Sequence, residues 1–218
     1  MPEFIPAINA DNFEEIERRV RLIEPLTRKF GIKYVHIDVA DGTFTKNSIW
    51  HDPKDLVGFK TIFDLELHLM ISDIDRRIDD WLFEPVSRIV FHLEAGHDPK
   101  LIIQKCIGAG IEAGIAIKPE TSWLKTKPHW DMVNLIQILG VNPGLAGQKM
   151  QPEITDKIRA LRQACLECII EVDGGVGVDN AGELVEAGAN IIVAASSIFG
   201  STDPKEAIKN LQSAITKS

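Results

Sequence analysis

The stretch from Tyr34 to Asn47 reads YVHIDVADGTFTKN. Two polar side chains, His36 and Asp38, alternate with apolar residues in its first half. His36 and Asp38 are two residues apart, so a β-strand would place both side chains on one face. A histidine and an aspartate that are buried side by side lose their hydration, which is costly unless something binds them. This pair therefore predicts a metal ion or a reaction at that face.

The same spacing of polar residues occurs near the ends of three other apolar segments. The further pairs are Glu66 with His68, His92 with Glu94, and Glu171 with Asp173. A single histidine in an apolar strand is usually a core residue, but histidines and aspartates at matching strand ends indicate a shared site. The predicted metal ligands are His36, Asp38, His68 and Asp173. This donor set suits a divalent ion such as zinc, manganese, iron or cobalt, and the spacing does not choose among them.

Turns of small residues follow three of the later apolar segments: glycine-rich turns within residues 142–148 and 173–176, and the turn Ala195-Ser196-Ser197. Glycine lets backbone N–H groups approach an anion closely, and the start of a helix adds positive partial charge. Each turn alone is typical of an ordinary strand-to-helix connection, but together they indicate a phosphate site. The residues predicted to bind the phosphate or other parts of a substrate are Gly144, Leu145, Ala146, Gly147, Gly174, Gly175, Ala195 and Ser196.

The elements that must position these residues alternate between strand-like and helical patterns. The strand-like segments are nearly continuous runs of Val, Ile and Leu, as in parallel strands that are buried on both faces. Eight such segments, most of them followed by a helix, predict an α/β fold, a (β/α)8 or TIM barrel that forms one domain over residues 1–218. In such a barrel the C-terminal ends of the strands carry the chemistry. An open, doubly wound sheet is the alternative.

The strands are expected at residues 4–8, 34–39, 61–70, 87–93, 111–117, 132–141, 168–172 and 190–194. The helices are expected at residues 12–30, 73–83, 99–109, 152–165, 179–187 and 204–217. Gly31 should end the first helix, and Asp73 should cap the second. The segment 121–130 has a short helical beginning that Pro128 interrupts.

Charge and hydropathy exclude several classes of partner. The 218 residues are 44% hydrophobic, which is enough for a full core. A formal net charge of −8 argues against nucleic acid and anionic membranes, although a small anionic substrate remains compatible. No apolar run approaches the roughly 18 residues of a transmembrane helix. The N-terminal segment has no basic region followed by an apolar stretch, so no signal peptide is expected.

The cysteines point to a reducing compartment. Their number is three, an odd and low count, so we expect a cytoplasmic protein. Cys165 and Cys168 have the spacing of a redox or zinc site. No second pair with this spacing exists, and Cys168 begins a strand-like run, so we expect both side chains simply to pack.

With these residues in view, the chain resembles the ribulose-phosphate 3-epimerase family over nearly its whole length. The family's motifs occur in the family's order at His36 to Gly42, His68 to Met70, His92 to Glu94, Asn142 to Gln148, Val172 to Val176 and Ala195 to Phe199. The resemblance implies a barrel of the ribulose-phosphate-binding type and a small phosphorylated ketose as substrate. It also implies self-association into a homo-oligomer.

The resemblance further implies a metal-assisted inversion of the carbon next to a ketone. His36, Asp38, His68 and Asp173 carry over as ligands of one divalent ion, and Asp38 and Asp173 carry over as the acid/base pair. Inversion removes a proton from one face of a planar enediolate and returns one to the other face, which two carboxyl groups can do directly. From ribulose to xylulose, the expected proton acceptor is Asp38 and the expected donor is Asp173. His68 and Met70 are expected to contact the substrate.

Several positions depart from the family pattern. Ala7 stands where the first strand usually has serine, and Ala195 stands where a glycine is usual. Ala40 and Leu139 replace methionines, so Met70 alone remains of three methionines that resemble an apolar wall over the enediolate. These changes predict a reshaped pocket. The small Ala7 and Ala40 favour, as an alternative substrate, a longer ketose phosphate such as allulose 6-phosphate.

Other functions match the sequence less well. Decarboxylase and synthase barrels of the phosphate-binding kind carry the pattern Asp-x-Lys-x-x-Asp in the second strand. Residues 36–41 of this chain contain no lysine. A Schiff-base aldolase would need Lys118 as nucleophile, but this lysine precedes Pro119 and is expected at the pocket edge or surface. A non-catalytic barrel that binds sugar phosphates is disfavoured because the aspartates and ligand histidines are all retained.

Overall fold

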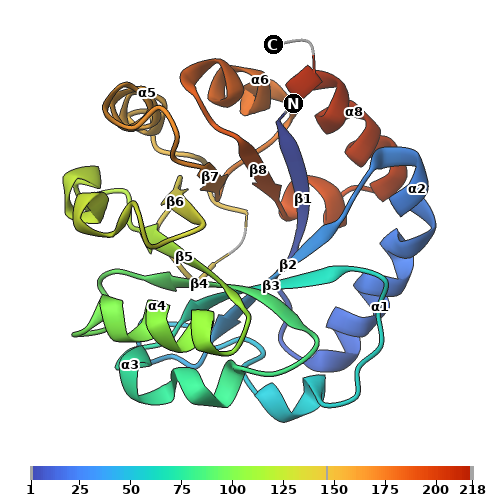
Figure 1. Cartoon of the computed structure of the whole chain (residues 1–218). Coiled ribbons are helices and arrows are strands. Elements are labelled where there is room, and N and C mark those ends of the chain that lie inside the picture. The colour runs from blue at the N-terminus through green and yellow to red at the C-terminus, as the bar shows by residue number, and fades with distance from the viewer. Residues whose placement is uncertain (1, 146, 217–218) are drawn as a thin grey trace.

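Parallel strands close into a barrel, and helices surround it (Figure 1). The computed structural model describes residues 2–145 and 147–216. The strands are β1 (Glu3–Ile8), β2 (Tyr34–Ala40), β3 (Asp64–Met70), β4 (Val86–His92), β5 (Glu112–Ile117), β6 (Leu135–Leu139), β7 (Ile170–Asp173) and β8 (Ile191–Ala194). Each strand pairs with the next in chain order, and β8 pairs with β1. The predicted (β/α)8 barrel is therefore confirmed, and the alternative of an open sheet is wrong.

Helices and short 3-10 turns connect the strands. The α-helices are α1 (Phe13–Ile23), α2 (Thr27–Phe30), α3 (Ile74–Arg77), α4 (Pro99–Gly108), α5 (Ile154–Ala164), α6 (Val178–Ala187), α7 (Ser196–Phe199) and α8 (Pro204–Thr216). The 3-10 helices are η1 (Glu24–Leu26), η2 (Pro53–Leu56), η3 (Ile78–Trp81) and η4 (Trp123–His129). Within the described residues, none of the helices has the length and apolar character needed to cross a membrane.

Two predicted helices are shorter than their sequence patterns suggest. The first is divided by η1, because Pro25 lacks the N–H that would continue α1, and Gly31 ends α2 at a φ of 65° as predicted. The second consists only of α3 and η3. Asp73 occupies the N-cap position of α3 as predicted, but its side chain makes no capping hydrogen bond there. Its carboxylate instead pairs with His97 at 3.2 Å.

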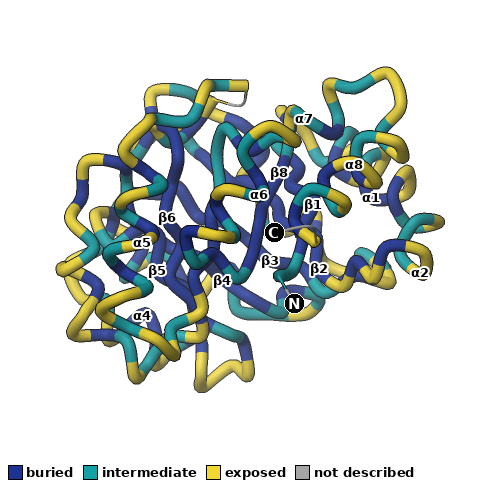
Figure 2. Tube along the Cα trace, turned by 90° about the horizontal axis from the view of Figure 1, so that it is seen from above, coloured by how far each residue is buried: buried dark blue, intermediate teal, exposed yellow. Residues whose placement is uncertain are grey.

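The apolar residues form one core inside the barrel and another between the strands and the helices. Inward-facing side chains such as Ile5 and Val193 belong to the inner core. The strand residues between them face outward, and those such as Ile37 and Val172 belong to the outer core. Figure 2 shows the strands almost entirely buried and the exposed positions on the outer helices and loops. Every residue of β2 is buried, so the polar residues on this strand lie among apolar neighbours.

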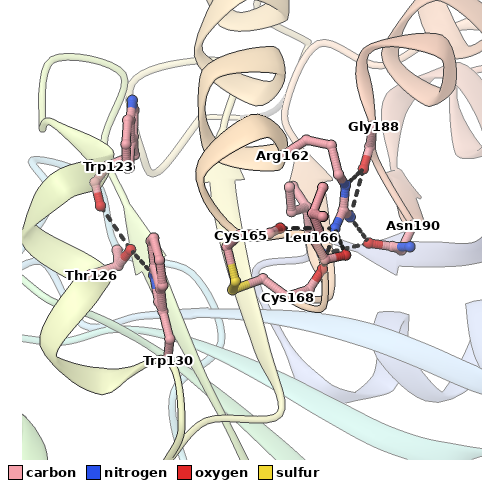
Figure 3. Close-up of a disulfide and its surroundings, with 10 residues drawn as sticks. Trp123, Thr126, Trp130, Arg162, Cys165, Leu166, Cys168, Gly188 and Asn190 are labelled. Carbon is pink, nitrogen blue, oxygen red and sulfur yellow. Dashed lines mark hydrogen bonds between the residues drawn. A yellow bond between two sulfur atoms is a disulfide. The ribbon is translucent and has the colours of Figure 1, made fainter.

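Cys165 and Cys168 form a disulfide in the loop between α5 and β7 (Figure 3). The expectation that these two residues simply pack is wrong. The loop brings their Cα atoms to 5.5 Å, a separation that suits a disulfide bridge. The remaining cysteine, Cys106, is a buried thiol whose pKa burial raises to about 12.

Arg162 of α5 fastens this disulfide loop to the connection between α6 and β8 (Figure 3). Its guanidinium donates hydrogen bonds to backbone carbonyls on both loops and to one side-chain amide oxygen. The acceptors are the carbonyl oxygens of Cys165, Leu166, Cys168 and Gly188 and the Oδ1 atom of Asn190. One side chain thus satisfies several carbonyl groups that no strand or helix pairs.

Replacing Arg162 with Met should lower the free energy of unfolding by about 2–3 kcal/mol, because these carbonyl groups lose their charged donor. Urea titration of the purified protein measures this change. Arg159→Met is the matched control on the same helix, since Arg159 pairs with Asp156 on the surface and its side chain is 47% exposed. The control should change the free energy by less than about 0.5 kcal/mol. Equal stability of the two variants would contradict the role given to Arg162.

Candidate active site

Polar side chains from β2, β3 and β7 converge inside the barrel near the C-terminal ends of these strands. Parallel pairing sets Asp38 directly beside His68. The Nδ1 atom of His68 lies 3.0 Å from Asp38 Oδ1 and 3.7 Å from Asp173 Oδ2. The Nε2 atom of His36 lies 3.4 Å from Asp38 Oδ1. The structure thus brings together the four predicted ligands, with one donor atom of each within 4.8 Å of the others.

His36 carries a buried nitrogen atom that has no hydrogen-bond partner, its Nε2 atom. The other ring nitrogen, Nδ1, lies 2.6 Å from Glu66 Oε1. An ionised carboxylate can only accept, so Nδ1 carries a hydrogen and Nε2 is the position that a proton or a cation would occupy. The side chain is fully buried, so water does not satisfy this position. An unpartnered nitrogen beside two carboxyl groups and a second histidine fits a divalent metal ion.

The two aspartates have pKa values shifted in opposite directions. Burial alone would raise the pKa of Asp38, but the adjacent imidazole groups of His36 and His68 outweigh burial and hold it well below its usual range. Burial raises the pKa of Asp173 to about 6; the charge of Asp38 adds to this rise, and the two histidines oppose it. Near neutral pH the Asp38 carboxyl group is therefore fully ionised, and the pH is close to the pKa of Asp173.

His36 has a raised pKa in the same cluster. Burial would lower it, but the carboxylates of Asp38 and Glu66 outweigh burial and raise the pKa well above its ordinary value. In the metal-free protein Nε2 of His36 therefore holds a proton, which a cation would have to replace. Metal binding at such a site releases protons, so its affinity depends on pH.

A second chain of side chains orients His68. Its Nε2 atom lies 2.9 Å from Nε2 of His92, and Nδ1 of His92 lies 3.3 Å from Glu94 Oε2. Burial lowers the pKa of His92 to about 4, so this ring is neutral. If His92 donates through Nδ1 to Glu94, its Nε2 accepts from His68. The Nδ1 atom of His68 would then be free to direct its lone pair at a cation shared with the aspartates.

A cavity opens over these residues at the C-terminal end of the barrel. Asp38, His68 and Asp173 line it, whereas His36 lies outside its lining. The predicted substrate-binding residues that also line it are Met70, Gly144, Leu145, Gly147, Gly174, Gly175, Ala195 and Ser196. Ala146 lies outside the described residues.

Two of these positions require glycine for steric reasons. Gly144 has a φ of +117°, and a Cβ atom there would lie 2.1 Å from Asn47 Oδ1. Gly175 has a φ of +70°, and a Cβ atom there would lie 2.4 Å from the backbone nitrogen of Met150. The loops after β6 and β7 thus approach Asn47 and Met150 more closely than any larger residue would allow.

Asn9 is a member of the site that the sequence did not reveal. Its Nδ2 atom donates to Asp38 Oδ2 at 2.9 Å, and its side chain lines the cavity. Asn9 follows β1 and lies two residues after inward-facing Ala7, so its place in the strand register was the available signal. Asn47 also contributes, because its Nδ2 atom donates to the carbonyl oxygen of Gly144 at 2.9 Å.

The positions that depart from the family pattern differ in their access to the cavity. Leu139 lines it, but Ala7 and Ala40 are fully buried and are not part of its lining. Ala40 packs instead against Ile49 and Met70. The expectation that the small residues Ala7 and Ala40 enlarge the pocket therefore lacks support. Lys118 is likewise outside the lining and has its Nζ atom 4.2 Å from the centre of the Phe44 ring.

The raised pKa of Asp173 leads to a pH-dependent prediction for the protein kept metal-free with a chelator. Its folded-state pKa of about 6 exceeds the ordinary value of 3.8, so this group's contribution to stability is present at low pH and is lost as pH rises through about 6. Asp173→Asn cannot ionise. It should match the unaltered protein near pH 4 and exceed its free energy of unfolding by up to about 2–3 kcal/mol near pH 8. Urea titration at both pH values measures the difference, and a difference independent of pH would contradict the assignment.

Comparisons with known sequences give consistent matches over most of the chain. A sequence profile described as the ribulose-phosphate 3 epimerase family matches residues 3–199. A ribulose-phosphate 3-epimerase of Bacillus subtilis (strain 168) is 32% identical over 219 residues, which cover 97% of this chain and 99% of the relative. One of Methanocaldococcus jannaschii is 36% identical, covering 84% and 80%. A chloroplastic ribulose-5-phosphate-3-epimerase of Arabidopsis thaliana is 34% identical, covering 95% and 75%.

Solved structures share the barrel at much lower identity. A 3-hexulose-6-phosphate synthase from Salmonella typhimurium has a TM-score of 0.68 at 12% identity, with 99% of each chain covered. An orotidine 5'-monophosphate decarboxylase from Sulfolobus solfataricus has a TM-score of 0.65 at 13% identity, covering 100% of this chain and 99% of the other. These likenesses establish the fold alone. The sequence matches confirm the resemblance that the motifs indicated, and the chain belongs to the ribulose-phosphate 3-epimerase family of isomerases, which act in carbohydrate metabolism.

Proposed function

We propose that this protein is a metal-dependent epimerase that inverts carbon 3 of a ketose phosphate and converts D-ribulose 5-phosphate into D-xylulose 5-phosphate. The observation that carries the proposal is the pair Asp38 and Asp173, two carboxyl groups at one cavity with pKa values shifted in opposite directions. The family match supports the reaction type.

The proposed mechanism gives each aspartate one proton transfer. Asp38, held as an anion by its histidine neighbours and by Asn9, accepts the proton from carbon 3. Asp173, whose pKa burial raises in the metal-free protein, gives a proton to the opposite face of the planar enediolate. The two residues lie on β2 and β7, which β1 and β8 separate around the barrel, so their carboxyl groups reach the cavity from different directions. In the reverse reaction the roles exchange.

His36, Asp38, His68 and Asp173 would hold one divalent cation, of zinc, manganese, iron or cobalt. When bound, the cation would supply positive charge that stabilises the negative charge developing on the substrate's oxygen atoms. His68 and Met70 would contact the sugar, since both line the cavity.

The glycine-rich end of the cavity is the proposed phosphate site. Gly174 and Gly175 follow β7, and Ala195 and Ser196 follow β8; these loops commonly bind phosphate in this fold. Gly144, Leu145 and Gly147 line the cavity and would also bind the substrate or its phosphate. The same binding role is proposed for Ala146. Leu145 is 65% exposed, which suits a residue at the mouth.

Further proposals concern the protein's partners and location. A formal net charge of −8 disfavours nucleic acid and anionic membranes as partners. We propose a homo-oligomer by analogy with the family, and a cytoplasmic location because the cysteine count is low and odd. The Cys165–Cys168 disulfide stands against that location, since cytosolic thiols are usually kept reduced.

Hydrogen exchange at carbon 3 tests the proposed reaction. Metal-loaded protein is incubated in deuterated water with D-ribulose 5-phosphate and, separately, with allulose 6-phosphate, and NMR follows loss of the proton from carbon 3. The ribulose ester should exchange faster, because Ala7 and Ala40, the small residues that would favour a longer ester, do not line the cavity. Faster exchange of the longer ester would replace the proposed substrate. Absence of exchange with either would leave a non-catalytic barrel that binds sugar phosphates.

Asp173→Asn should lower turnover by about 10²–10⁴-fold, because the amide cannot return a proton to the enediolate. Steady-state assays of the metal-loaded variant measure this loss. Asp179→Asn is the matched control, since Asp179 is exposed on α6 and outside the cavity lining; it should keep full activity. An active Asp173→Asn variant would refute the mechanism with two acid/base groups.

A further inference from the structure

A row of inward-facing charged residues crosses the barrel from His36. In the strand register, His36 of β2 pairs with Glu66 of β3, Glu66 pairs with Arg88 of β4, and Arg88 pairs with Glu112 of β5. Residues that share one level of a parallel sheet and face the same side lie next to one another. We call these four residues the charged row.

Short, charge-assisted contacts connect the charged row from end to end. His36 Nδ1 lies 2.6 Å from one oxygen of Glu66, and the other oxygen of Glu66 accepts from Arg88 Nη1 at 2.7 Å. Arg88 Nε donates to Glu112 at 2.6 Å. The Arg88 guanidinium carbon lies 4.1 Å from the centre of the Tyr34 ring, which fixes its plane.

Burial makes these contacts specific. Glu66 is fully buried and Arg88 is 7% exposed, so bulk water has little access to either charge. A buried carboxylate needs a buried cation, and Arg88 provides it with fixed geometry. Only the far end is open, since the Glu112 side chain is 40% exposed at a cavity that Glu3 and Arg88 also line.

The charged row fixes which ring nitrogen of His36 carries a hydrogen and which one faces the site. With both oxygens of Glu66 engaged, one of them remains an acceptor for His36 Nδ1, so the hydrogen stays on Nδ1 and Nε2 faces the other predicted ligands. His68 is held differently, through neutral His92. A carboxylate behind a metal-binding histidine fixes its tautomer and orientation, and losing such a partner typically weakens metal binding about 10–100-fold.

We propose that Glu66 and Arg88 are positioning residues of the metal site, with Arg88 holding the Glu66 carboxylate that keeps His36 Nε2 directed at the cation. The inference rests on the proposed metal-dependent function. It concerns cation affinity, which is measurable without turnover.

The test is a titration of metal-stripped protein with Co²⁺. Calorimetry and the visible spectrum of the bound ion measure the binding. Glu66→Gln keeps the side-chain shape and removes the charge, and Arg88→Met keeps much of the stem and removes the guanidinium. Both variants should bind Co²⁺ about 10–100-fold more weakly and with an altered spectrum. Glu183→Gln is the matched control on the exposed side of α6, outside the charged row, and should bind like the unaltered protein.

A double variant separates positioning from folding. Arg88→Met alone leaves Glu66 buried without its cation and could unfold the barrel. Glu66→Gln combined with Arg88→Met removes both charges, and its free energy of unfolding is measured beside its cobalt affinity. A folded double variant with weakened binding supports the inference, and one that binds as tightly as the unaltered protein overturns it. Failure of the unaltered protein to bind Co²⁺ would overturn the proposed metal dependence itself.

Discussion

Ionisable side chains buried in a closed barrel must satisfy one another, and the site depends on this constraint. His36, Asp38 and His68 are each less than a tenth exposed, and the Asp173 side chain is 13% exposed. In surroundings with so little water, an unpaired carboxylate or imidazolium is costly. The donor atoms nevertheless face one another with one nitrogen left unpartnered. Such an arrangement is stable when a cation, or the protons that replace it, balances the carboxylates.

Parallel pairing of the strands supplies the geometry that this constraint demands. The side chains of a strand alternate between the two faces, so a one-residue shift of β2 would turn its whole polar set toward the helices. Closure fixes the register of every strand against two neighbours. It therefore places Asp38 beside His68, and one level lower it places His36 beside Glu66. The ligands and the residues behind them are positioned by the same hydrogen bonds that hold the barrel together.

The parts of the site that could be predicted are those that the spacing of neighbouring residues in the sequence indicates. His36 and Asp38 are visible because polar residues stand out in an apolar strand. The role of Asn9 was hidden, because its contact with Asp38 spans 29 residues and depends on the pairing of β1 with β2. The packing of Ala40 was misjudged for a similar reason, since Ile49 reaches it from a loop. Cys165 was misjudged because an odd cysteine count says nothing about how a loop turns.

The two histidine ligands are held by partners of different character, and this difference has a chemical consequence. His36 is backed by the ionised pair of Glu66 and Arg88, whereas His68 is backed by the neutral ring of His92. A carboxylate behind an imidazole makes its free nitrogen more basic, and a neutral ring does so less. His36 should therefore be both the stronger donor to a cation and the stronger competitor for a proton. The charged row thus makes the affinity of fully buried His36 for a cation depend on pH. Asp38 and Asp173 instead face the cavity, where the proton transfers would occur.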